Sequence, residues 1–326
     1  MPSVVCFGEA LVDFLAEPGQ DPHAPLHFVR HAGGAPANVA VAVARLGSPS
    51  VFLGMLGRDM FGDFLLESLD AAGVSTACVV RTDAANTALA FVTLDADGER
   101  RFSFYRPPSA DLLFRPQHFE DACFASTVIF HACSNSLTEA AIADTTLDGM
   151  RRAHAAGGLV SFDMNLRAAL WPKDVDPHPR IWRALHTAEL VKLSAAELVF
   201  LAESLGSETA VLDELWHGRT QWLWVTDGAR PLRYFTRAMQ ETLPVFAVQT
   251  LNTTAAGDAF VGGMLSWLLR EDVNAATLTG FLANNSRMQK AIRFANACGA
   301  LAVTRHGAFE AMPSHAEVER FLREQA

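Results

Sequence analysis

The chain has 326 residues, with 26 Lys plus Arg against 36 Asp plus Glu, so its formal net charge is −10 when His is neutral. This balance argues against a broad nucleic-acid interface, which needs a basic surface to displace counterions. Half of the residues are hydrophobic and 19% are charged, a composition typical of a folded domain rather than a disordered chain.

The cysteines and the apolar runs indicate where such a chain works. Its five Cys are odd in number and scattered, which predicts free, mostly buried thiols in a reducing compartment. No uncharged apolar run approaches the length that would span a bilayer, and the N-terminus lacks a basic leader segment. We therefore expect a cytoplasmic protein without a membrane partner.

Short apolar runs alternate with longer stretches of helical spacing from the N-terminus onward. The predicted buried strands are Val4 to Phe7, Val51 to Leu53, Thr127 to Phe130, Leu159 to Asp163, Leu190 to Leu193 and Trp222 to Val225. The predicted helices between them are Asn38 to Leu46, Gly62 to Ala72, Thr138 to Ala156 and Ala195 to Ser204. This alternation favours an α/β fold with a doubly wound, mainly parallel sheet flanked by helices.

Two segments depart from this alternation. Leu11 to Arg30 carries three prolines, and Ala88 to Tyr105 brackets the turn residues Asp95 to Gly98, so both predict extended strands without helices. They could form a small separate sheet. After Gln249 the pattern is almost purely helical, over Gly257 to Leu269, Met288 to Val303 and Ser314 to Arg323.

Several common ligand-binding motifs are missing from the sequence. No two of the 22 Gly are two or four positions apart, which excludes the G-x-G-x-x-G fingerprint and the G-x-S-x-G nucleophile elbow. There is no Gly-Lys pair for a Walker A loop and no His-Glu pair for an H-E-x-x-H zinc site. An α/β protein without these motifs binds its ligand by other means.

The richest remaining signal is the run from Leu251 to Phe260, between the apolar residues Val245 to Val248 and a helical pattern. Small residues at a strand-to-helix turn let backbone N–H groups face outward, and the helix N-terminus adds partial positive charge. This pattern predicts an anion site. Asp258 falls in the first helical turn, where a dipole-favouring or capping carboxylate is the alternative interpretation.

A second signal is the run from His31 to Asn38, which leads into a predicted helix. Its paired glycines permit close approach of the backbone to a ligand, whereas Asn38 alone is also explained as a helix N-cap.

Two further polar runs follow consecutive buried strands. Asp163 to Arg167 follows one strand and Lys192 to Glu197 follows the next, so both emerge where open α/β sheets place their ligands. Ser194 and Glu197 alone are also explained as a capping box. Polar groups at several strand ends favour one shared site.

Taken in order, these motifs resemble the ribokinase-like (PfkB) carbohydrate kinases, most closely the fructokinase branch. The resemblance rests on Gly8 to Asp13, Gly33 to Asn38, Gly57 to Gly62, Gly98 to Arg100, the Asp258 run and Asn296 to Ala300, and it covers nearly the whole chain. It implies a single ribokinase-like domain over residues 1–326, with a small β lid formed by about 11–32 and 86–107. It also implies phosphoryl transfer from ATP to a primary hydroxyl of a sugar, most favourably fructose.

The resemblance assigns roles to individual residues. Asp258 matches the catalytic base, and Ala255, Ala256 and Gly257 match the anion hole. The positions that match sugar-binding residues are Asp13, Gly33, Gly34, Asn38, Asn165 and Arg167, with Arg106 on the lid reaching toward the same pocket. The positions that match the nucleotide site are Lys192, Thr226, Gly228 and Asn296, and Glu197 matches the residue that organises Mg²⁺, through water.

Three residues depart from the family pattern. Asn252 stands where an Asp usually supports a monovalent cation, so a K⁺ site there is in doubt. Ser194 replaces the Asn of the N-x-x-E motif, and its hydroxyl is compatible with holding a water. Pro231 stands where a nucleotide-loop Gly is common, which fixes φ and stiffens that loop.

Alternative functions stay open at this point. The pair Tyr105 and Arg106 could meet a sugar-acid carboxylate, as in a 2-keto-3-deoxygluconate kinase or another PfkB-type sugar or nucleoside kinase. A non-catalytic sugar-binding regulator on the same fold is the alternative from another class. The apolar alternation at Ala88 to Leu94 is compatible with a homodimer formed through the lid.

Overall fold

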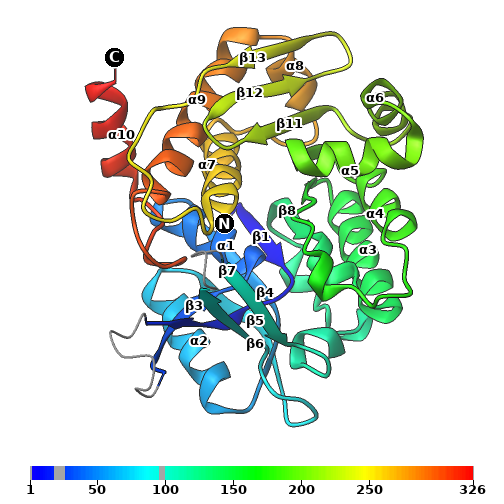
Figure 1. Cartoon of the computed structure of the whole chain (residues 1–326). Helices are drawn as coiled ribbons and strands as arrows, with labels where there is room; N and C mark the ends of the chain where they lie inside the picture. The colour runs from blue at the N-terminus through cyan, green and yellow to red at the C-terminus, as the bar shows by residue number, and fades with distance from the viewer. Residues whose placement is uncertain (1, 18–25, 95–99, 326) are drawn as a thin grey trace.

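The computed structural model describes residues 2–17, 26–94 and 100–325. Its main sheet has nine strands (Figure 1). Across the sheet the strands run β13 (Gln240–Leu243), β12 (Arg230–Phe235), β11 (Trp222–Asp227), β10 (Leu190–Ser194), β9 (Leu159–Asp163), β8 (Thr127–Cys133), β1 (Ser3–Phe7), β4 (Ser50–Gly57) and β5 (Ser75–Thr82). From β11 to β5 all neighbours pair in parallel, whereas β12 and β13 add an antiparallel edge. The predicted doubly wound, mainly parallel sheet is confirmed.

Helices cover both faces of this sheet because alternate strand residues point to opposite sides. In β1, Val4 and Cys6 pack into one hydrophobic cluster and Val5 and Phe7 into another. The first cluster includes residues of α1 (Ala35–Arg45), α2 (Met60–Ala71), α7 (Ala256–Arg270), α8 (Leu278–Leu282) and α9 (Asn285–Ala302). The second includes residues of α3 (Ala140–Ala155), α4 (His178–Leu185), α5 (Ala195–Leu205) and α6 (Glu208–His217), while α10 (His315–Glu324) packs against α9.

The strand and helix predictions fall on observed elements, with a few differences. The prediction missed β5, β12, β13, α4, α6 and α8, which are short or lie at the sheet edge with mixed exposure. The apolar run at 245–248 is not a strand. Its residues are irregular and partly exposed, because they line a cavity instead of pairing with the sheet.

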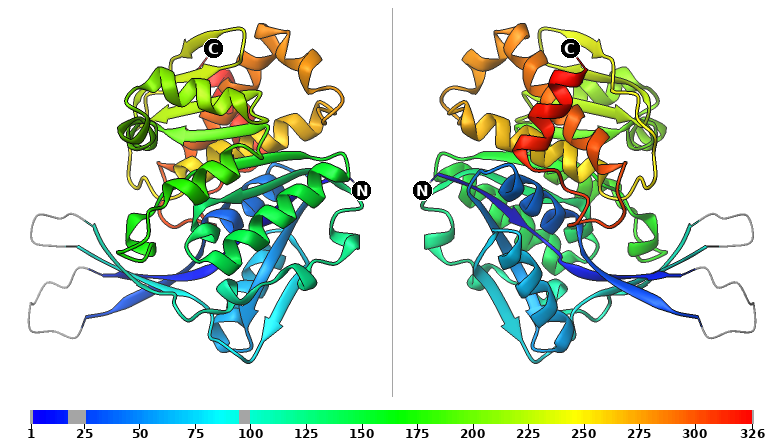
Figure 2. Two further views of the ribbon diagram at one scale, coloured as in Figure 1. Left: turned by 90° about the vertical axis from the view of Figure 1, so that its right-hand side faces the viewer. Right: turned by 90° about the vertical axis from the view of Figure 1, so that its left-hand side faces the viewer.

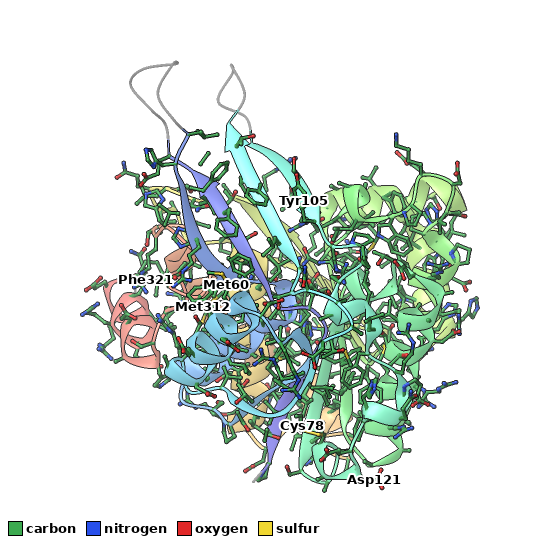
Figure 3. All side chains as sticks on the ribbon, turned by 90° about the horizontal axis from the view of Figure 1, so that it is seen from below. Met60, Cys78, Tyr105, Asp121, Met312 and Phe321 are labelled. Atoms are coloured by element: carbon green, nitrogen blue, oxygen red, sulfur yellow. A yellow bond between two sulfur atoms is a disulfide. The ribbon has the colours of Figure 1, made fainter. Side chains whose placement is uncertain are left out.

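A second, four-stranded sheet extends away from the main body (Figure 2). Its order is β3 (Phe28–Gly33), β2 (Leu11–Ala16), β6 (Leu89–Leu94) and β7 (Arg100–Tyr105). All four strands come from the two segments that interrupt the α/β alternation, and the predicted turn at 95–98 lies outside the described residues. Tyr105, labelled in Figure 3, is exposed on this sheet. Its action as a lid stays a prediction.

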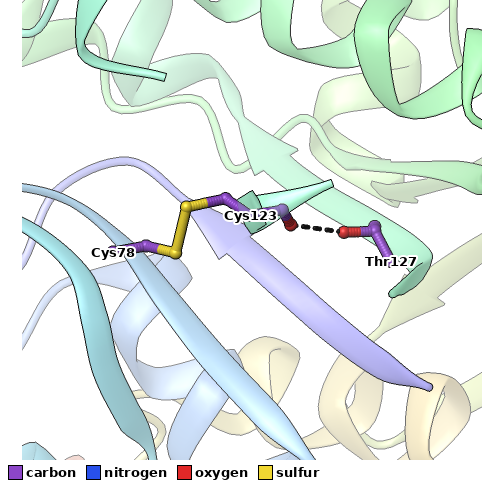
Figure 4. Close-up of a disulfide and its surroundings, with 3 residues drawn as sticks. All are labelled: Cys78, Cys123 and Thr127. Atoms are coloured by element: carbon purple, nitrogen blue, oxygen red, sulfur yellow. Dashed lines mark hydrogen bonds between the residues drawn. A yellow bond between two sulfur atoms is a disulfide. The ribbon is translucent and has the colours of Figure 1, made fainter. Parts of the chain in front are cut away.

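The cysteines correct one expectation. Cys78 on β5 and Cys123 near the start of β8 form a disulfide, so the prediction that all thiols are free is wrong for this pair (Figure 4). The two residues are 45 positions apart in the sequence, yet the fold brings their Cα atoms to 6.4 Å. Cys6, Cys133 and Cys298 are free and buried, as expected. Among the described residues, no helix combines the length and the apolar character needed to cross a membrane.

The contact between α1 and α7 depends on a glycine. A Cβ atom on Gly262 would collide with the Ala42 side chain and lie 3.2 Å from the Val39 carbonyl oxygen. Because both helices are buried along this contact, neither has room to retreat.

We predict that Gly262→Ala lowers the free energy of unfolding by about 1–3 kcal/mol through overpacking. Gly280 in α8 is the matched control, because a Cβ atom there would meet nothing within 4 Å. Gly280→Ala should be neutral or stabilising by up to ~1 kcal/mol, as alanine is the better helix former. Urea denaturation measures both, and equal effects would contradict the close approach of α1 and α7.

Candidate active site

A cavity of about 940 Å³ opens at the carboxyl ends of β9, β10 and β11. This is the edge where open α/β sheets bind their ligands. The predicted site residues that line it are Asp13, Gly34, Asn38, Asn165, Arg167, Lys192, Glu197, Thr226, Gly228, Ala255, Ala256, Gly257, Asp258 and Asn296. Segments that lie far apart in the sequence thus meet around one space.

Three predicted residues do not line this cavity. Gly33 lies behind Asp13, and a Cβ atom there would collide with the Asp13 carboxylate. Arg106 is buried, and its Nε and Nη2 donate to Asp111 Oδ2 at 2.8 and 2.6 Å, so it is held away from the pocket it was expected to reach. Asn252 lines a small adjacent hollow, and its Oδ1 accepts a hydrogen bond from Thr254 N at 2.8 Å.

The N-terminus of α7 faces the cavity without a side-chain cap. Its N-cap residue Ala255 has a left-handed backbone, with φ 60°, and gives no side-chain cap. Ala256 N makes only a long contact of 3.4 Å with the Thr253 carbonyl oxygen. The first-turn N–H groups have no partner within the helix, and the helix dipole makes their surroundings positive. The Lys192 ammonium lies 3.1 Å from the position a Cβ atom would take on Gly257. A cation beside an uncapped helix start forms a cradle that suits an anion such as a phosphate.

Asp258 lies in the first turn of α7 but does not cap it. Its Oδ2 accepts a hydrogen bond of 2.7 Å from Asn38 Nδ2, across α1 and α7. Burial raises the pKa of Asp258 above its ordinary value, and the Asn38 hydrogen bond with the charges of Arg167 and Lys192 opposes this rise. Asn38 is not the N-cap of α1 either, because that position is held by Gly34.

Asp13 is a second carboxylate in the same space, and it is half-buried. Burial raises its pKa to about 7, and the negative charge of Asp258 contributes to the rise. Two carboxylates in one cavity, with Asn38 beside them, offer several acceptors for hydroxyl groups of a polar ligand.

Lys192 and Asp163 form a buried ion pair in the cavity wall, with 3.1 Å between Nζ and Oδ1. Burial lowers the pKa of Lys192, but Asp163 and Glu197 more than compensate, so its pKa lies above the ordinary value and the ammonium is charged. Burial also raises the pKa of Asp163, and Lys192 opposes that rise.

Glu197 combines a structural contact with a place in the cavity wall. Its Oε2 accepts from Ser194 N at 2.6 Å, while Ser194 Oγ accepts from Glu197 N at 3.2 Å, so the predicted capping box is confirmed. Its Oε1 accepts from Leu166 N at 2.8 Å. The carboxylate is therefore oriented by two backbone N–H groups at the edge of the cavity.

Sequence reasoning assigned no role to Glu9, Asn135 or Asp163, which are among the polar residues of the cavity wall, although Asp163 opens the polar run to Arg167 that it placed at a strand end. Glu9 Oε1 accepts from Asn135 Nδ2 at 2.9 Å and from Ala35 N at 3.3 Å, at the start of α1. Glu9 follows β1 and Asp163 ends β9, so the strand-end pattern that indicated Asn165 could also have found them.

The cavity belongs to a chain with extensive similarity to known proteins. The profile of the pfkB family carbohydrate kinases matches residues 1–315. Fructokinase-1 of Oryza sativa subsp. japonica is 40% identical over 320 residues, covering 98% of this chain and 97% of that protein. The structure of fructokinase from Xylella fastidiosa with bound ATP has a TM-score of 0.96 and 55% identity, covering 99% of this chain and 98% of that one. A double-mutant fructokinase from Vibrio cholerae O395, solved with fructose, ADP and potassium ion, has a TM-score of 0.85 and 33% identity, covering 99% and 98%.

We predict that the Asp13 carboxyl titrates near pH 7, since its pKa is raised to about 7. Asp258→Asn should lower this midpoint, because it removes a neighbouring negative charge that favours the protonated form. Burial remains, so the midpoint should stay above the ordinary value of about 3.9. Carbon-13 NMR of labelled carboxyl groups, assigned with Asp13→Asn, measures it. A midpoint near the ordinary value in both proteins would contradict the geometry.

Proposed function

The chain belongs to the pfkB family of carbohydrate kinases, and we propose that it is an ATP-dependent fructokinase. The observation that carries the proposal is Asp258, a buried carboxylate held by Asn38 at the uncapped start of α7. A base and an anion cradle then lie on the same helical turn. Full-length similarity to fructokinases supports the choice of sugar.

In the proposed reaction, Asp258 accepts the proton of the primary hydroxyl of the sugar. The hydroxyl oxygen forms a bond to the γ-phosphorus of ATP, the bond from that phosphorus to the β–γ bridging oxygen breaks, and ADP leaves with the electron pair. Such a transfer needs positioning and charge stabilisation more than covalent help. The backbone N–H groups at Ala255, Ala256 and Gly257, with Lys192, are the proposed donors to the transferred phosphoryl group.

The sugar is proposed to bind at the end of the cavity that holds the two carboxylates. Asp13, Gly34 and Asn38 line this end, and Gly33 supports Asp13 from behind. Asn165 and Arg167 line the wall and are proposed to meet the sugar and the phosphates. Thr226, Gly228 and Asn296 are the proposed nucleotide contacts. Pro231 lies in β12 beside that loop, and its stiffening of the loop stays a prediction.

Mg²⁺ would be held beside Glu197 in this proposal. No group of three metal-ligating side chains gathers anywhere in the described part of the chain, which fits an ion held largely through water. When bound, Mg²⁺ neutralises charge on the phosphates. Asn252 is uncharged and its Oδ1 already accepts from Thr254 N, so the doubt about a K⁺ site at this residue stands.

The observation behind the sugar-acid alternative is weakened by the structure. Tyr105 is 67% exposed and Arg106 pairs with Asp111, so neither lines the cavity.

A location in the cytoplasm and a homodimer through the second sheet are further proposals. Exposed Val29 and Tyr105 support the dimer, and sedimentation velocity at low concentration tests it.

We predict that a panel of sugars with ATP and Mg²⁺ shows brisk phosphorylation of fructose and little of 2-keto-3-deoxygluconate. The reason is that Arg106, the cation expected to bind the carboxylate of the keto-acid, is paired with Asp111 and does not line the cavity. Coupled release of ADP measures turnover. Brisk turnover of the keto-acid beside none of fructose would reject fructokinase, and sugar-dependent thermal stabilisation without ADP release would favour the non-catalytic regulator.

We predict that Asp258→Asn reduces kcat by ~10² to 10⁴, the usual range for loss of a general base, with substrate binding largely kept. Asp63 offers a matched control, because it is the first-turn carboxylate of α2 and is exposed away from the cavity. Asp63→Asn should leave turnover unchanged. An unchanged rate for Asp258→Asn would remove this residue from its proposed role.

A further inference from the structure

Asp163 is a buried carboxylate to which the proposed reaction assigns no role. It ends β9 at the cavity, is 2% exposed, and contacts two residues proposed to face the phosphates. Its Oδ2 is buried without a hydrogen-bond partner. A buried carboxylate with an unpartnered oxygen costs folding free energy, so its presence calls for an explanation outside stability.

The first contact of Asp163 fixes a strained turn. Asn165 has φ 38°, a left-handed conformation that is uncommon for residues other than glycine. Asp163 Oδ1 accepts a hydrogen bond of 3.1 Å from Asn165 N, which closes the turn locally. Glu197 Oε1 holds the next N–H, that of Leu166, at 2.8 Å. The segment that carries Asn165 and Arg167 is thus fixed on two sides.

The second contact of Asp163 places a cation. The same Oδ1 lies 3.1 Å from Lys192 Nζ, and this ammonium stands beside Gly257 at the start of α7. Lys192 also interacts electrostatically with Glu197 and Asp258. Asp258 lies in the first turn of α7 itself, so only Glu197 pulls from elsewhere; without Asp163, Glu197 would draw the ammonium away from the helix start.

We propose that Asp163 is a positioning residue of the phosphoryl-transfer site, whose one carboxylate oxygen holds both Lys192 and the Asn165 turn toward the phosphates. The inference rests on the proposed function and adds a residue that it does not use. Asp163 acts through its two neighbours, so changing it should affect ATP more than fructose.

Two substitutions separate the two contacts. In Asp163→Asn the side-chain oxygen still accepts from Asn165 N, but the charge opposite Lys192 is gone. We expect the KM for ATP to rise about tenfold while the KM for fructose stays within about twofold. In Asp163→Ala both contacts are gone, and we expect kcat to fall roughly tenfold relative to Asp163→Asn, because the turn is also released.

Glu189→Gln is the matched control, because it shows what the loss of a buried carboxylate does at a place away from the cavity. Glu189 is buried, and its Oε2 accepts a hydrogen bond of 2.8 Å from Val160 N. Val160 lies near the start of β9, the strand that Asp163 ends. Its loss should lower the melting temperature without moving the KM for ATP. If Asp163→Asn behaves in the same way, or keeps a wild-type KM for ATP, the proposal is wrong.

A double variant keeps the test available if Asp163→Asn does not fold. Asp163→Asn combined with Lys192→Gln removes both charges of the buried ion pair together, so neither partner is left without the other. Since Asp163→Asn should act through Lys192, the double variant should match Lys192→Gln alone in its KM for ATP. A further tenfold rise in the double variant would overturn the inference.

A failure of the proposed kinase function can be told apart from a failure of the proposed role of Asp163. A wild-type protein that phosphorylates no sugar would reject the kinase, whatever the variants do. Calorimetric titration with ATP still tests Asp163 in that case. About tenfold weaker ATP binding in Asp163→Asn than in Glu189→Gln supports its positioning role, and equal binding rejects it.

Discussion

The hydrogen bond from Asn38 to Asp258 is the contact on which the site depends. It spans 2.7 Å between residues 220 positions apart and joins α1 to α7 inside the core. Its geometry requires the two helices to approach closely, which the missing side chain of Gly262 allows. It also opposes the rise in pKa that burial imposes on Asp258. The packing of α1 against α7 therefore also determines how far the pKa of the proposed base is raised.

The proposed anion site of this acidic protein depends on local arrangement rather than on net charge. The chain carries a formal charge of −10, and Asp13, Asp163 and Asp258 all line the cavity. Against them stand Lys192, Arg167 and the uncapped N–H groups of α7. Fixed dipoles and one or two placed cations are sufficient for a phosphate, because the local field and not the molecular charge acts on it.

The sequence predicted the strands and helices that carry strong hydrophobic patterns, and it indicated the strand ends where the cavity opens. It could not predict contacts made by the fold alone. Arg106 was expected at the pocket, but Asp111 holds it elsewhere, and Cys78 meets Cys123 only because the fold brings together residues 45 positions apart. Likewise, no local pattern showed that Glu9 would accept from Ala35 N. The family resemblance supplied residue roles, which stay proposals.

The position of β1 between β8 and β4 has a consequence for synthesis of the chain. β1 is made before its neighbours yet is central in the sheet, and its second neighbour ends at Cys133. The buried face of α1 stays without its partner until α7 follows, beyond residue 255. An emerging chain must therefore keep an apolar helix exposed while most of the protein is made, a period in which aggregation competes with folding. Helix α7, which carries the proposed base, arrives late and completes both the core and the cavity.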